Sequence, residues 1–194
     1  HRILDEGVRV TETGEDFVRF IHGITSETGY GYDYVKEIAI TSGNSFVIRH
    51  SLRNTGSKTL KGDAYNHNFF TLGLLQTGPS RTIDFPFRPD GDWRAEYSEV
   101  GFTDDGIRFS RVLKKGESVF TGNLHEAGRG LDGSPNAFVL SEHQTGRSVR
   151  MSCAVPMTKS VFWSNHRIAC IEPYIDFEIF SGQDFSFEIH YSLK

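Results

Sequence analysis

The chain has 194 residues, enough for one substantial domain, with 37% hydrophobic residues and a formal net charge of −4. Sixteen Phe and seven Tyr supply the aromatic mass of a packed core, and no run approaches the roughly 18 apolar residues that a membrane-spanning helix needs. Basic and acidic residues are mixed along the chain, so no basic surface for nucleic acid is indicated. We therefore expect a protein that takes a neutral small molecule and binds neither nucleic acid nor a membrane.

Short alternating or apolar runs, separated by Gly, Asn, Asp and Ser, extend along the whole chain. No window of about 12 residues carries a capped apolar stripe at helical spacing. The runs predict strands at Val8–Glu12, Phe17–Ile24, Tyr34–Thr41, Ser45–Asn54, Leu60–Leu72, Ile107–Val112, Ser118–Asn123, Ala137–Glu142, Ser148–Ala154, Ser160–Trp163, Ala169–Ile175 and Phe185–Leu193. Many closely spaced strands joined by tight turns are typical of a β-sandwich or barrel, so we predict an all-β fold in one domain over residues 1–194.

Two regions interrupt this pattern. Residues 76–106 are polar and contain three prolines together with Trp93 and Tyr97, and residues 122–135 are rich in glycine. We predict both as long loops, which in a compact domain are commonly functional or mobile. Trp93 would either stack on a sugar or anchor its own loop.

The two cysteines and the first residue bear on cellular context. Cys153 and Cys170 both lie in apolar surroundings, which favours buried thiols, although a disulfide between neighbouring strands stays open. The chain begins at His1 without a methionine, so we expect an N-terminal portion, and any signal peptide, to be absent. We place the protein in the cytoplasm.

The chain contains no sequence motif for a metal-dependent enzyme or for a serine hydrolase. There is no His-x-His, no His-Glu-x-x-His and no Cys-x-x-Cys pair, and His125, Glu126 and His166 lie on separate segments. A zinc or iron centre needs three or four convergent ligands. A Gly-x-Ser-x-Gly elbow is also missing. We predict no metal and no cofactor.

The stretch Ala64–Phe70 reads Ala-Tyr-Asn-His-Asn-Phe-Phe. As a strand it would place Tyr65, His67 and Phe69 on one face. Aromatic rings cover the apolar face of a pyranose, and an imidazole exchanges protons with sugar oxygens, so this face is a candidate sugar site. The alternative is a buried histidine that only satisfies a neighbouring carbonyl.

A second stretch, Ala169–Ile175, has Glu172 inside an apolar strand and directly before Pro173. A carboxylate is costly to bury in such a run unless it is paired or used, and the proline predicts an edge or a bend. Glu172 is therefore either a general base that faces a cleft or an edge-strand glutamate that points to water. Just before this strand lies a cluster that either lines the cleft or forms a solvated turn, made of Trp163, Asn165, His166 and Arg167.

Three segments in order resemble the aldose 1-epimerase (galactose mutarotase) family. The first is the Asn-Thr-Gly turn at residues 54–56, followed by the histidine and aromatic residues of Tyr65–Leu72. The others are residues 132–140, which end in Phe-Val-Leu, and the tail from Ile171-Glu172-Pro173 to the last strand. The resemblance spans residues 30–194. It implies a galactose mutarotase-like β-supersandwich, of which this chain would be the C-terminal two-thirds.

The resemblance also implies sugar 1-epimerisation without a cofactor, with His67 matching the family's catalytic acid and Glu172 its catalytic base. The anomeric hydroxyl would give its proton to the carboxylate while the ring oxygen gains one from the imidazolium, whose charge a nearby carboxylate favours. Ring opening, rotation about C1–C2 and reclosure then yield the other anomer.

Candidate sugar-binding residues come from both lines of reasoning. Tyr65, Trp93 and Arg167 offer aromatic and polar contacts, and Asn136 or Asp132 would stand in for the family's substrate-clamping aspartate.

Two other functions stay open. One is a carbohydrate-binding protein on the same fold without turnover, and the other is the sandwich portion of a larger polysaccharide-processing enzyme. An enzyme requires His67 and Glu172 to face one cleft with room for a pyranose between them.

Overall fold

The computed structural model describes residues 6–129, 136–155 and 157–194. Every regular element in these ranges is a β-strand, and the strands form two antiparallel sheets. The all-β prediction is therefore confirmed. Over the same residues there is no helix long and apolar enough to cross a membrane.

The residue contacts divide the chain into two compact units. Unit 1 comprises His1–Asp63 and Asp176–Tyr191, and unit 2 comprises Ala64–Ile175 and Ser192–Lys194. Three strands contribute residues to both units, namely β5 (Leu60–Tyr65), β14 (Ala169–Ile179) and β15 (Asp184–Leu193). A single domain over residues 1–194 stays a prediction.

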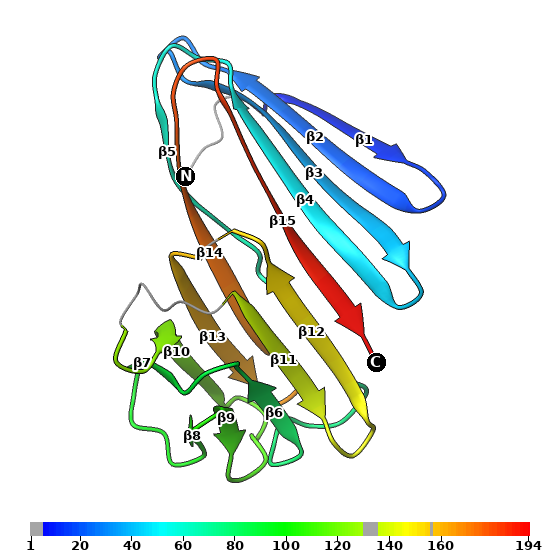
Figure 1. Ribbon diagram of the computed structural model, residues 1–194, viewed down its shortest axis with the longest axis vertical. Helices are drawn as coiled ribbons and strands as arrows, with labels where there is room; N and C mark the ends of the chain where they lie inside the picture. Colours follow the sequence, from blue (N-terminus) through cyan, green and yellow to red (C-terminus); the bar gives the residue numbers. More distant parts are fainter. Residues whose placement is uncertain (1–5, 130–135, 156) are drawn as a thin grey trace. The chain divides into compact units, whose positions relative to one another are not determined.

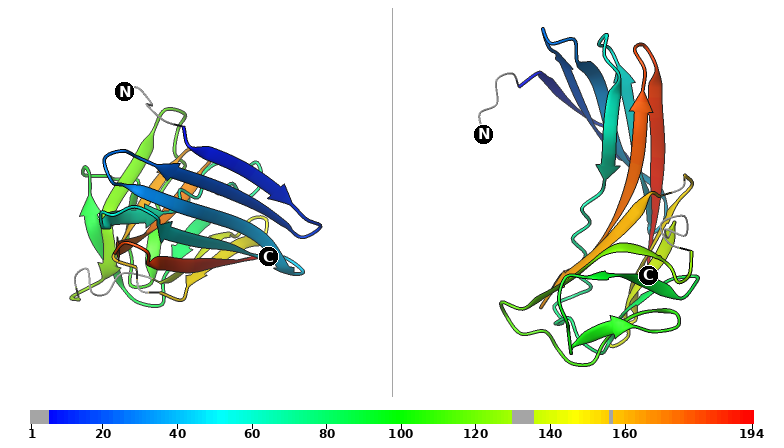
Figure 2. Two further views of the ribbon diagram at one scale, coloured as in Figure 1. Left: turned by 90° about the horizontal axis from the view of Figure 1, so that it is seen from above. Right: turned by 90° about the vertical axis from the view of Figure 1, so that its left-hand side faces the viewer.

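Unit 1 is built on successive antiparallel hairpins followed by the last strand, in the order β1-β2-β3-β4-β15 (Figure 1). Its first four strands are β1 (Val8–Thr13), β2 (Phe17–Thr25), β3 (Gly31–Ser42) and β4 (Ser45–Asn54). The β3–β4 hairpin turns through Gly43, whose φ of 48° suits glycine because it has no Cβ. Figure 2 shows the twist that these strands share.

The Asn-Thr-Gly turn that follows β4 is held by the side chain of Asn54, which is fully buried. Its Nδ2 donates to the carbonyls of Lys58 and Ile179, at 2.8 Å each, and its Oδ1 accepts from the backbone N–H of Gly56 at 3.0 Å. A buried amide with three good partners fixes the turn. This part of the sequence motif therefore has a structural role.

Unit 2 has two layers. One sheet contributes the order β12-β11-β6-β9-β8 and the other the order β14-β13-β10-β7. The strands that lie wholly in this unit are β6 (Arg81–Asp84), β7 (Pro89–Trp93), β8 (Val100–Phe102), β9 (Gly106–Phe109), β10 (Ser118–Glu126), β11 (Ala137–Glu142), β12 (Arg147–Cys153) and β13 (Lys159–Asn165).

Aromatic contacts join the two layers of unit 2. Phe109 of β9 lies 6.3 Å from Phe162 of β13, and Trp93 of β7 lies 4.9 Å from Phe102 of β8, measured between ring centroids. The apolar side chains between the layers are almost fully buried and include Ile83, Ile107, Leu124, Phe138, Leu140 and Ile171. The packing is that of a β-sandwich.

The predicted long loop at residues 76–106 is wrong in part, because it contains β6, β7 and β8. These strands have three to five residues each, too short for an alternating pattern to stand out. Pro89 is the first residue of β7, a position at which a strand tolerates proline. In the glycine-rich region, β10 continues to Glu126, and residues 130–135 lie outside the described ranges.

The predicted strand Leu60–Leu72 ends at Tyr65. The next four residues are irregular, and Phe70 makes an isolated bridge to Ala169. Asn68 gives the physical reason, because its side-chain Nδ2 donates to the carbonyl of Ile171 at 3.2 Å, where a continuing strand would offer a backbone N–H.

Candidate active site

An open hollow of about 450 Å³ lies in unit 2 and is lined by Tyr65, His67, Phe69, Arg94, Phe120, Trp163 and Glu172. Its volume falls within the range of small-molecule sites, about 300–1,000 Å³. The lining combines aromatic rings with an imidazole, a guanidinium and a carboxylate. Such a set suits a sugar, which offers apolar C–H faces and many hydroxyl groups.

One wall is the irregular segment after β5. Tyr65, His67 and Phe69 all line the hollow, while Asn66 between them is buried. Residues two apart therefore share a face here, although the segment is not a strand. The ring of Phe69 stacks on the imidazole of His67 at 4.1 Å, and Tyr65 stacks on Tyr174 at 4.6 Å. These stacks hold the wall in place.

Glu172 comes from β14, which lies between β5 and β13 in its sheet. Of the expected edge or bend, the edge is therefore excluded. Glu172 is paired opposite Val161 and only 6% exposed, which places its carboxylate in the protein rather than in water. The hydroxyl of Tyr174 donates to its Oε2 at 3.4 Å. The buried carboxylate is thus partnered, as burial requires.

The imidazole of His67 contacts two side chains of β14. Its Nε2 lies 3.2 Å from Oε1 of Glu172, and its Nδ1 lies 3.1 Å from Sγ of Cys170. The Cys170 thiol also donates to Oε1 of Glu172 at 3.5 Å. Cys170 and Glu172 are two residues apart on a strand and so point to the same face.

Burial raises the pKa of the Cys170 thiol well above its usual range, and the negative charge of Glu172 adds to the effect. A backbone hydrogen bond from Asn68 acts in the opposite direction and is the weaker influence. Cys170 is therefore a neutral thiol at pH 7 and not a nucleophile. Cys170 and Cys153 are both buried and are not joined in a disulfide, so the prediction of buried thiols is confirmed.

His67, Cys170 and Glu172 are also a group that could hold a metal ion, with one ligand atom from each lying within 4.8 Å of the others. Residue 67 is about a hundred positions from residues 170 and 172, so the sequence shows no metal-binding motif. Only the fold brings the three side chains together.

The remaining sequence candidates lie elsewhere. Trp93 packs against Tyr97 and Phe102 and lines a different hollow, in keeping with an anchoring role. Arg167 is exposed in the turn before β14, where its backbone accepts a hydrogen bond from buried Arg81.

Asn136 is exposed before β11, and its carbonyl accepts from the backbone N–H of Cys153. It is not among the residues that line the hollow around His67. Asp132 lies outside the described residues.

Arg94 and Phe120 line the hollow without having been assigned as sugar-binding residues from the sequence. Trp163 also lines it, which is one of the two outcomes expected for the cluster before β14. The guanidinium of Arg94 lies 3.9 Å from the ring centroid of Phe120, so its orientation is fixed by a cation–π contact. Phe120 belonged to a predicted strand and Trp163 to the end of another. Arg94 follows β7, for which the sequence gives no pattern.

No family model and no curated protein sequence matches the chain. Solved structures do match. A galactose mutarotase related enzyme from Lactobacillus acidophilus superposes with a TM-score of 0.69 at 14% identity, over 96% of this chain and 71% of that one. The chain has the galactose mutarotase-like fold.

Two further structures with this fold agree. A galactose mutarotase-like protein from Lactobacillus casei gives a TM-score of 0.65 at 12% identity, over 96% of this chain and 73% of that one. An aldose epimerase homologue from C. elegans gives a TM-score of 0.62 at 13% identity, over 96% of this chain and 68% of that one. The resemblance inferred from the sequence is thereby confirmed for the fold, which is all that identities this low establish.

Proposed function

We propose that the chain is an aldose 1-epimerase-like enzyme that interconverts sugar anomers, with Glu172 as the base and His67 as the acid. One observation carries the proposal. The carboxylate and the imidazole meet at 3.2 Å in a hollow with aromatic walls. The galactose mutarotase-like fold supports the reaction class by analogy.

The reaction needs one proton acceptor and one proton donor at the same sugar. Glu172 accepts the proton of the anomeric hydroxyl, so that C1 becomes a carbonyl carbon and the bond from C1 to the ring oxygen breaks. His67 donates a proton to that ring oxygen, which becomes a hydroxyl. After rotation about C1–C2 the steps run in reverse from the other face, and both side chains regain their starting states.

The contact between the two side chains dictates how the sugar lies. Nε2 and Oε1 are only 3.2 Å apart, so the expected room for a pyranose between the two side chains is absent. The ring must instead lie across the pair. Phe69 and Trp163 meet edge to face at 6.2 Å and form a corner against which the apolar face of the sugar would pack. Arg94 would donate to its hydroxyl groups.

A carbohydrate-binding protein without turnover is the second candidate, and the same contact favours it. While the imidazole of His67 and the carboxylate of Glu172 contact each other, they are less available for proton transfer to a substrate. The hollow would then hold a sugar by stacking and hydrogen bonds and leave its anomers unchanged.

The test follows the interconversion of freshly dissolved α-glucose and α-galactose by polarimetry or NMR. We expect acceleration that Glu172→Gln lowers by about 10²–10⁴-fold, the usual contribution of a general base. Glu178→Gln is the matched control, because Glu178 lies on the same strand with its side chain 51% exposed. Saturable sugar binding without acceleration across a panel of aldoses would refute the enzyme and establish the binding protein.

A further inference from the structure

The side chain that the proposed chemistry leaves unused is Cys170, and its surroundings match the ligand set of zinc. Its Sγ lies 3.1 Å from Nδ1 of His67 and 3.5 Å from Oε1 of Glu172. Ligand atoms around a tetrahedral zinc stand about 3.4–3.6 Å apart, given Zn–S of about 2.3 Å and Zn–N and Zn–O of about 2.0–2.2 Å. The sulfur–oxygen separation already fits. The sulfur–nitrogen separation needs to open by about half an ångström.

We propose that His67, Cys170 and Glu172 bind a thiophilic divalent cation, Zn²⁺, and that the bound cation switches off sugar epimerisation. The second half rests on the proposed function, whereas the first stands on the geometry alone. His67 must also turn so that a single ring nitrogen faces both Sγ and Oε1, which its Nδ1 and Nε2 contact separately. Its side chain is 39% exposed and its segment is irregular, which permits that movement.

Charge favours this cation in this place. A thiolate, a carboxylate and a neutral imidazole carry two negative charges, which Zn²⁺ balances. Without the cation a thiolate at Cys170 would lie 3.5 Å from Oε1 of the Glu172 carboxylate, and the two negative charges would repel each other. Binding replaces the S–H proton of Cys170 and one N–H proton of the His67 imidazolium with bonds to zinc, and both protons are released to the buffer.

Residues that contact the three ligands orient them, as the hydrogen-bond partners of ligands do at known metal sites. Tyr174 donates to Oε2 of Glu172 and so leaves Oε1 to face the cluster. The backbone of Asn68 donates a hydrogen bond to the Cys170 side chain. Phe69 stacks on His67 and excludes water from one side of the ring. Three protein ligands leave a fourth position towards the hollow.

The cation and the epimerase reaction would compete for the same atoms. Zinc occupies the carboxylate oxygen that must accept the anomeric proton, and it replaces the imidazole proton that must reach the ring oxygen. We therefore expect Zn²⁺ to inhibit the metal-free enzyme, with the inhibition depending on Cys170.

The experiment uses the full chain and Co²⁺ as a spectroscopic stand-in for Zn²⁺. We expect a thiolate-to-cobalt charge-transfer band that Zn²⁺ abolishes by displacement, and proton release on Zn²⁺ binding measured by calorimetry in two buffers. Cys170→Ala should lose the band and weaken Zn²⁺ binding by at least about 100-fold, since even outer-shell groups contribute 10–100-fold. Cys153→Ala is the matched control, a second buried cysteine outside the cluster, and should keep both.

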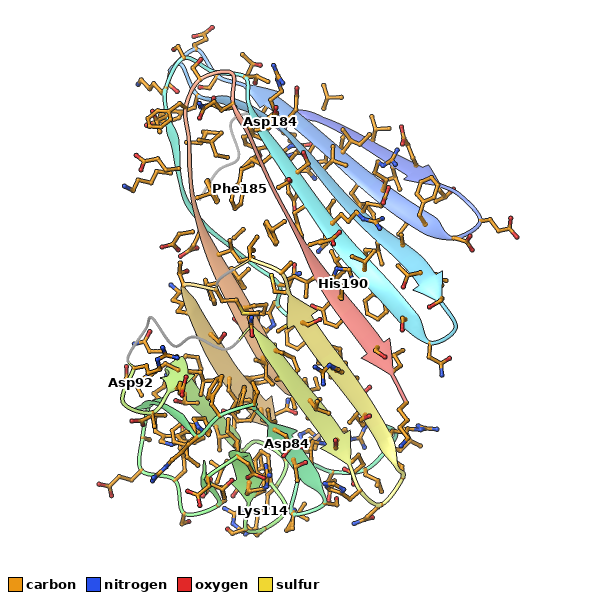
Figure 3. The ribbon with its side chains drawn as sticks, in the orientation of Figure 1. Asp84, Asp92, Lys114, Asp184, Phe185 and His190 are labelled. Carbon is orange, nitrogen blue, oxygen red and sulfur yellow. The ribbon has the colours of Figure 1, made fainter. Side chains whose placement is uncertain are left out.

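Surface binding is separable from this site. Nε2 of His190, a residue labelled in Figure 3, lies 2.8 Å from Oε1 of Glu188. Both side chains are exposed, so this pair could bind a cation at the surface with no sulfur ligand. Cobalt binding to the wild type without a thiolate band, or equal Zn²⁺ affinity in Cys170→Ala, would overturn the site. The cobalt absorption spectrum of the wild-type chain tests for a thiolate ligand even if Cys170→Ala fails to fold.

The two halves of the proposal fail differently. Metal-free protein that never accelerates mutarotation would refute the proposed function, while the cobalt spectrum still decides the metal site. Active enzyme that shows the thiolate band but keeps its rate at saturating Zn²⁺ would refute the inhibition. Support requires inhibition of the wild type and of Cys153→Ala at the same Zn²⁺ concentration that produces the spectral change.

Discussion

Glu142→Gln should destabilise unit 2 strongly. The side chains of Arg81 and Glu142 are both fully buried, with Nε and Oε2 3.6 Å apart, so charge rather than a hydrogen bond joins them. Burial lowers the pKa of Arg81, and the charge of Glu142 opposes that effect. The substitution keeps the size of the side chain and removes the charge that balances the guanidinium.

Breaking a buried pair by removing one partner costs about 3–5 kcal/mol. Arg81 keeps donating to Thr77 and to the carbonyls of Leu75 and Arg167, which favours the lower end of that range. A loss of about 3 kcal/mol lowers the urea midpoint by roughly 1–1.5 M for a slope of about 2–3 kcal/mol/M. Urea unfolding followed by fluorescence measures the shift.

Asp104→Asn is the control, because Asp104 pairs with Arg88 at 3.7 Å while its side chain is 96% exposed. It should change stability by less than about 0.5 kcal/mol. A cost below about 1 kcal/mol for Glu142→Gln, or one equal to the control, would show that the pair is not a stabilising buried tie between β6 and β11.

Three further outcomes are expected. Trp163→Ala should raise the Kd for a bound aldose roughly 2- to 10-fold, from the loss of about 0.5–1.5 kcal/mol of ring contact, and an unchanged NMR titration would remove Trp163 from the sugar site. Burial raises the pKa of Tyr34 to about 12, so the unfolded chain loses that proton first and stability should fall as the pH rises from 10 to 12; a phenol titrating near pH 10 that Tyr34→Phe removes would contradict this. Asn54→Ala should cost about 2–3 kcal/mol, because it strips partners from buried backbone groups, and a change in unfolding free energy below about 0.5 kcal/mol would argue against it.

Much of the fold was predictable because alternation and turn chemistry are local signals. The strands Ser45–Asn54 and Ala137–Glu142 match their predicted bounds, since each is a short run with apolar strand-forming residues between clear turns. The stretch after Tyr65 was predicted as strand because its aromatic residues suit one. There the side-chain N–H of Asn68 takes the place of a backbone N–H donor, and hydrophobic periodicity in the sequence cannot show such a hydrogen bond.

The candidate site was predictable only where a motif marks it. His67 and Glu172 were named from the residue types and the family resemblance, and the fold brings them together from positions far apart in the sequence. Cys170 was read as a plain buried thiol, because its contact with His67 exists only in three dimensions. Arg94 carries no sequence signal, since the strand before it is too short to show alternation.

The central claim is that His67 and Glu172 act as one acid–base unit, and a double-mutant cycle on the mutarotation rate tests it most directly. His67→Ala and Glu172→Gln should each remove most of the acceleration, and the double variant should lose no more than the more damaged single one, because groups that act together are not additive. Losses that multiply would mean that the two residues act independently. A rate that survives both substitutions would place the chemistry elsewhere in the hollow.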